Sequence, residues 1–131
     1  MPRISSAARV STRFWPRFAP GELAFPGMAI AAVSISPVGV GVSVSRYVTA
    51  ALQVVRTQDR VSYRLDPMFT TLEGDIADIF DLVRRMQDAV FEAGAQRVAT
   101  VIKIDDRRDR DVRMQDKVRA VEEQLRRDRE T

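Results

Sequence analysis

The stretch from Val61 to Asp75, VSYRLDPMFTTLEGD, most constrains what this chain can fold into. It holds two extended runs of alternating, β-branched and aromatic residues on either side of Asp66-Pro67. Proline presets φ for a turn and the aspartate before it can bond nearby backbone, so the pair predicts a hairpin. Asp75 follows Gly74 and can cap a helix with its carboxylate. Strand, turn, strand and helix are therefore expected in direct succession.

Length and composition limit the possible classes of protein. A chain of 131 residues with 45% hydrophobic residues is sufficient for one domain with a single core. No apolar run approaches the ~20 residues that cross a bilayer, so we expect a soluble, cytoplasmic protein with no membrane partner. The chain has no Cys or His, which excludes thiol nucleophiles, disulfides, imidazole bases and the usual zinc ligands. Any metal would need oxygen ligands, and we expect no metal site and no required cofactor.

The net charge of +3 does not predict a nucleic-acid partner, because the charge is unevenly placed. Residues 1–27 contain four arginines and one glutamate, which account for the whole excess. The remainder has 17 of the 21 basic and 17 of the 18 acidic residues, and is neutral. A neutral body has no general field that attracts phosphates.

The first 27 residues differ in composition from the rest of the chain. They hold four of the six prolines and no sustained apolar period, so we expect a disordered leader before a single domain at residues 28–131. Their arginine-rich, acid-poor composition is similar to that of a transit peptide, although prolines at 16, 20 and 26 fit an amphipathic targeting helix poorly. The alternative is a mis-assigned upstream start, with translation beginning at Met28.

Periodicity predicts the remaining elements. Strands are expected at Ala29–Ser36 and Arg97–Asp105, because apolar residues alternate in both. The connector after the first strand, Pro37-Val-Gly-Val-Gly, contains neither nucleotide-binding glycine pattern.

Three helices are expected from apolar residues at helical spacing. Ser43 or Ser45 can cap the first, which ends near Arg56, and Gly94 can end the second. The expected stripe of the first helix is Val44, Val48, Ala51, Leu52 and Val55. That of the second is Ile76, Ile79, Phe80, Val83, Met86 and Val90. The last has a narrow stripe, Met114, Val118, Val121 and Leu125, typical of a helix that packs against another helix.

This order of elements is the split βαβ pattern, βαββαβ with an additional C-terminal helix. It predicts a ferredoxin-like α+β fold, an antiparallel sheet with the second and fourth strands at its edges. Both main helices cover one sheet face, and the other face would expose apolar residues in a monomer. Burial of apolar area contributes ~25 cal/mol of free energy per Å². We therefore expect self-association through this face and through the C-terminal helix.

From Met28 to about Leu125 the chain resembles the small thiamine-binding protein family. The likeness is carried by ISPVG from residue 35 with SRYV from residue 45, by YRLDPMFTTLEGD from residue 63, and by VIKIDDRRD from residue 101. The resemblance implies dimers paired into homotetramers, a pocket for thiamine or its hydroxymethylpyrimidine part, and no established catalysis.

Thiamine carries a hydrogen-bonding aminopyrimidine and a cationic thiazolium, and the matching stretches contain suitable partners. Tyr47 or Met68 could pack on a ring, and Glu73 or Asp105 could offset the cation. The hydroxyls proposed for the pyrimidine edge are Ser34, Ser36, Thr70 and Thr100. Lys103 completes the candidate set, and Arg107 and Arg108 could clamp a phosphate on a phosphorylated ligand.

Each candidate also has a structural explanation. Tyr47 can border the core, Met68 can fill a gap, and the threonines suit strands in any case. Glu73 can stabilise a helix N-terminus instead of facing a pocket. Lys103 and Asp105 share a strand face and can form a simple ion pair.

Three functions remain open. The first is non-catalytic binding of thiamine or a related pyrimidine, in storage, sequestration or delivery, with no catalytic residue. The second is an enzyme that uses Glu73 or Asp105 as acid or base on a small heterocycle. The third is an assembly or regulatory protein in which a bound ligand changes the contacts between subunits.

Overall fold

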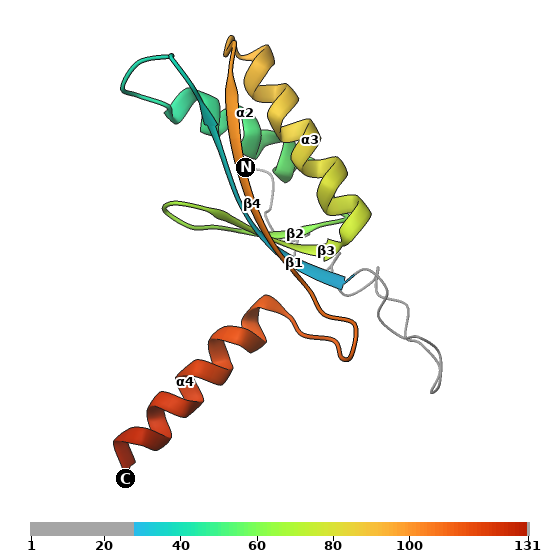
Figure 1. Cartoon of the computed structure of the whole chain (residues 1–131), viewed down its shortest axis with the longest axis vertical. Coiled ribbons are helices and arrows are strands. Elements are labelled where there is room, and N and C mark those ends of the chain that lie inside the picture. Colours follow the sequence, from blue (N-terminus) through green and yellow to red (C-terminus); the bar gives the residue numbers. More distant parts are fainter. Residues whose placement is uncertain (1–27, 131) are drawn as a thin grey trace, which may run out of the picture.

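A computed structural model describes residues 28–130 as an antiparallel sheet with helices. The expectations for residues 1–27 lie outside the described residues. The elements are β1 (Met28–Pro37), α2 (Ser45–Arg56), β2 (Ser62–Leu65), β3 (Thr70–Asp75), α3 (Ile76–Glu92), β4 (Val98–Asp106) and α4 (Met114–Glu130). The strand order β2-β3-β1-β4 puts β2 and β4 at the edges, as predicted. The ferredoxin-like α+β fold with an additional C-terminal helix is confirmed (Figure 1).

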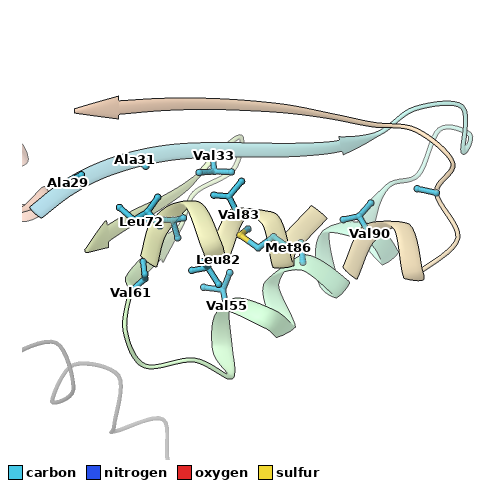
Figure 2. Packing of buried hydrophobic residues seen from close by; sticks show 13 residues of the cluster. Ala29, Ala31, Val33, Val55, Val61, Leu72, Leu82, Val83, Met86 and Val90 are labelled. Atoms are coloured by element: carbon cyan, nitrogen blue, oxygen red, sulfur yellow. The ribbon is translucent and has the colours of Figure 1, made fainter. Parts of the chain in front are cut away.

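The core lies between one face of the sheet and the pair of helices α2 and α3. Alternation in β1 points Ala31 and Val33 into this layer, where their exposed fractions are 0% and 2%. Leu72 of β3 pairs with Ala31 and is equally buried. Figure 2 shows these side chains on the side of the sheet where Val83 of α3 lies, and Leu82 belongs to the same cluster. We call the opposite face of the sheet the open face.

The hairpin and the two ends of α3 form as the sequence predicts. The Asp66 backbone N–H donates to the Phe69 carbonyl across the turn, at 3.0 Å. Asp75 caps α3, because its carboxylate accepts from the Ala77 backbone N–H at 2.8 Å. Gly94 follows α3 with a φ of +115°, a conformation that a side chain would strain.

The predicted cap of α2 is wrong. Val44 occupies the N-cap position, and no side chain caps the free N–H groups of the first turn. Ser43 and Ser45 contact each other through their hydroxyls, at 3.4 Å. A serine near a helix start is a capping residue only where its backbone leaves the hydroxyl facing the free N–H groups.

The helix stripes are partly corrected. Phe80, predicted in the core, is 53% exposed, whereas Leu82 is fully buried. The buried stripe of α3 includes positions 79, 82, 83, 86 and 90, and residue 80 lies about 100° around the helix from residue 79. Val44, at the N-cap of α2, and Val48 in its first turn remain 39% and 37% exposed, and the buried residues of α2 are Ala51 and Val55.

α4 differs from the other helices. It projects away from the body in Figure 1, and none of its residues is buried. The predicted stripe is present but exposed, with Val118, Val121 and Leu125 at 42%, 61% and 54%. Within residues 28–130, no helix has both the length and the apolar character needed to span a membrane.

Candidate functional site

The open face carries a defined set of side chains, because register and alternation fix which residues point away from α2 and α3. Its members on three strands are Ile30, Ala32, Ser34 and Ser36 of β1, Thr71 and Glu73 of β3, and Ala99, Val101, Lys103 and Asp105 of β4. Five of the nine predicted site residues are in this set. The open face is therefore the candidate site.

Two carboxylates lie in one row across the open face. Ile30 of β1 pairs with Glu73 of β3 on one side and with Asp105 of β4 on the other. Two strand spacings separate the acids, which puts their backbones about 10 Å apart. The two carboxylates therefore do not share a proton in the manner of a catalytic dyad.

Glu73 is buried, with an exposed fraction of 4%, and both of its oxygens are bonded by the start of α4. Oε1 accepts from Nη1 of Arg113 at 2.8 Å, and Oε2 accepts from the Met114 backbone N–H at 2.8 Å. Arg113 precedes α4 and cannot accept a bond from the helix through its guanidinium. Glu73 thus supplies the acceptor for the Met114 N–H that the side chain of Arg113 cannot provide. It stabilises a helix N-terminus, as one interpretation held, but that of α4 rather than α3.

Asp116 completes this arrangement from within α4. Its carboxylate accepts from the Arg113 backbone N–H at 2.9 Å, which is the reciprocal half of a capping box. The first turn of α4 is consequently held by one acid of its own and one from β3.

Asp105 is half exposed and bonds to α4 as well. Lys117 donates a hydrogen bond to its carboxylate, and this bond together with the charge of Lys117 holds the pKa of Asp105 below its usual value. The predicted partner, Lys103, contributes only a weaker Coulombic attraction. The ion pair of Asp105 therefore joins β4 to α4 rather than two positions on one strand.

Thr70 and Thr100 point to the other face of the sheet. Thr70 pairs with Val33 in register and is 8% exposed, on the side that α2 and α3 cover. The Thr100 hydroxyl donates to the side-chain oxygen of Gln87 in α3. The sheet separates both hydroxyls from Ser34, Ser36 and the two acids.

Tyr47 and Met68 lie outside the open face. Tyr47 in α2 is partly buried against the hydrophobic core, with the Arg46 guanidinium 5.5 Å from its ring centroid. Met68 is 79% exposed, in the turn between β2 and β3. The structure thus divides the predicted residues among the open face, the core side and a turn.

A hollow of about 370 Å³ lies between the β4–α4 connection and α4. It is lined by Arg107, Arg110, Asp111, Val112, Asp116, Lys117 and Ala120. The hollow adjoins the candidate site through Lys117, the partner of Asp105. Among residues 28–130, no group of three or more acids lies together in a way that could hold a metal ion.

Sequence reasoning missed Arg113 and Lys117. They follow Glu73 and Asp105 by 40 and 12 residues, so no local spacing connects them. The available signal was weak: one basic residue precedes the last helix and another follows in its first turn, while β3 and β4 each place an acid on the same face.

Comparison with known proteins assigns the chain to a family. The family model described as thiamine-binding protein matches residues 31–122. A UPF0045 protein of Staphylococcus xylosus is 43% identical, over 75% of this chain and 95% of its own length.

Two solved structures are similar to this chain in both sequence and fold. A protein of Methanocaldococcus jannaschii is 34% identical with a TM-score of 0.68, over 73% of this chain and 97% of that one. A domain of unknown function from Bacillus cereus is 35% identical with a TM-score of 0.64, over 70% of this chain and 88% of that one. On these grounds the chain is a member of the thiamine-binding protein family, which also bears the name UPF0045.

Proposed function

We propose that this protein binds thiamine or a related pyrimidine, without catalysis, as a homo-oligomer that stores, sequesters or delivers the ligand. The observation that carries the proposal is the family match over residues 31–122, which covers most of β1, the other three strands and both helices of the core. No cofactor is needed for such a role.

The open face supports this ligand chemically. A flat heterocycle needs an apolar surface, and Val101, 57% exposed, provides one opposite Ser34 and diagonal to Ala32. Ser34 and Ser36 on β1 offer hydroxyls that both donate and accept. Glu73 and the half-exposed Asp105 place two negative charges on this face, and both attract a cationic ring.

Self-association would complete the site. A flat sheet face leaves most of a small ligand in water, whereas binding sites bury 70–90% of a ligand's surface. A second copy over the open face would enclose the ligand and bury Val101. Each Å² of apolar area removed from water in this way contributes ~25 cal/mol to the free energy of association. The exposed stripe of α4, Val118, Val121 and Leu125, offers a second contact between copies.

The arrangement of acids favours binding over acid–base catalysis. Glu73 is engaged by Arg113 and a backbone N–H, and Asp105 is engaged by Lys117. A general base needs an accessible lone pair close to the substrate proton, and a coupled pair of acids needs close approach. Neither condition is met by these two groups as they stand.

Calorimetry tests the proposal directly. Thiamine, its phosphates and hydroxymethylpyrimidine are titrated into the full chain, and light scattering gives the mass. We expect measurable heat with at least one ligand and a mass above that of one chain. Asp105→Asn should weaken binding of thiamine, whereas Asp59→Asn, on an exposed connector, should not. Absence of heat with every ligand at millimolar concentration would overturn the proposal.

A further inference from the structure

We propose that Arg113 is a built-in competitor for the ligand: a bound cation takes its place on Glu73 and detaches the start of α4 from β3. This inference rests on the proposed function, since it concerns how the same open face receives thiamine. It adds Arg113 to the site as a residue that determines which ligands are accepted.

Burial makes Glu73 the group for which cations compete. Its side chain is 5% exposed, and a buried carboxylate without a partner is strongly destabilising. Both of its partners, Arg113 and the Met114 N–H, belong to the same short segment. Any group that replaces one of them must bring equivalent charge or an equivalent donor.

Arg113 can leave Glu73 at modest cost. Its side chain is 28% exposed, and its Nε already lies 3.8 Å from the Asp111 carboxylate, which can retain the charge. α4 has no buried residue, so moving its first turn gives up little apolar burial. The second tie, between Lys117 and Asp105, is exposed on both sides and correspondingly weak.

The geometry of Glu73 specifies the class of ligand. One oxygen is matched to a positive charge and the other to a neutral N–H donor. A replacement therefore has to combine a cation with an N–H group. Thiamine has both, in its thiazolium and its amino group. Hydroxymethylpyrimidine has only the neutral amino group and would leave the charge of Glu73 uncompensated.

Hydrogen exchange of the wild-type chain tests the displacement. Saturating thiamine should accelerate exchange of the amides from Met114 to Lys117, and saturating hydroxymethylpyrimidine should leave them unchanged. Equal exchange with and without bound thiamine would overturn the inference while leaving the proposed function in place.

Affinity measurements give a second test. Arg113→Ala should bind thiamine several-fold more tightly than wild type, because the competitor is gone. Arg110→Ala removes the same charge from the same connection and serves as the control for general electrostatics. Arg113→Lys keeps a cation and should stay close to wild type.

The outcomes separate the two proposals. Thiamine affinity that is no tighter in Arg113→Ala than in Arg110→Ala would overturn the competition at Glu73, provided that thiamine binds wild type. Absence of thiamine binding in wild type and in Arg113→Ala alike would overturn the proposed ligand itself. If Arg113→Ala does not fold, the exchange comparison in wild type decides alone.

Discussion

The Glu73 carboxylate accepts a hydrogen bond at 2.8 Å from the backbone N–H of Met114, 41 residues further along the chain. A strand residue on the open face thereby caps the last helix. Because α4 buries none of its own residues, polar contacts of this kind set where it leaves the sheet. The direction of α4, and with it the placement of its apolar stripe, depends on two acids of the sheet, Glu73 of β3 and Asp105 of β4.

Replacing Glu73 should lower stability. Glu73→Gln keeps the size of the side chain but removes the charge that pairs with Arg113, so we expect a loss of about 1–3 kcal/mol in the free energy of unfolding. Urea denaturation measures the loss. Glu122→Gln makes the same chemical change on the exposed surface of α4 and should cost almost nothing. Equal stabilities for the two variants would show that the buried contact contributes no net stability.

Asp75 should stabilise α3 through its cap. Asp75→Ala removes the acceptor of the Ala77 N–H and should cost about 1 kcal/mol. Asp75→Asn keeps a side-chain oxygen at the N-cap and should recover most of that loss. Thermal or urea unfolding of the three proteins gives the comparison, and an Asn variant as unstable as the Ala variant would contradict the assignment of the cap.

The fold could be predicted because each of its elements has a local signal. Each of these signals depends only on residues close together in the sequence. Examples are the alternation in β1 and β4, the turn at Asp66-Pro67 and the cap at Asp75. Phe80 shows the limit of such signals. A large apolar residue one position away from the buried stripe satisfies the pattern almost as well as Leu82, and only packing against the sheet decides between them.

The site could be predicted only in part, because alternation assigns a residue to a face but not to a partner. It places Ser34 and Ser36 together, and it puts Thr100 on the face opposite Asp105. It does not reveal that Glu73 meets Met114, since that contact depends on the path of a connection rather than on any period. Contacts of this kind are absent from the sequence pattern even where both residues are conspicuous.

The ion pair of Asp105 with Lys117 should make stability depend on pH. The pKa of Asp105 in the folded chain lies below its ordinary value of 3.8, chiefly because Lys117 donates a hydrogen bond to it. The pair therefore stabilises the fold above pH 3.8, and its contribution disappears as the pH falls through the lowered pKa. Since both groups are about half exposed, the contribution should stay below about 1 kcal/mol.

Unfolding of wild type and Asp105→Asn between pH 2.5 and about 6 measures this contribution. The two proteins should differ most in free energy of unfolding at the upper end, and the difference should shrink as the pH falls below 3.8. Lys117→Met should abolish the difference by removing the partner. A difference that does not change with pH would mean that the Asn variant is destabilised by something other than the lost charge.

The stripe of α4 should matter for association rather than for the fold of one chain. Val121 is 61% exposed, so a charge placed there meets water in a monomer and costs the fold little. In a contact between copies, Val121→Glu would bury an unpaired carboxylate and should dissociate the assembly, which light scattering detects as a smaller mass. Ala120→Glu adds the same charge to the same helix about 100° away from Val121 and is the matched control. An unchanged mass in Val121→Glu would place the contacts between copies elsewhere, with the open face around Val101 as the remaining surface.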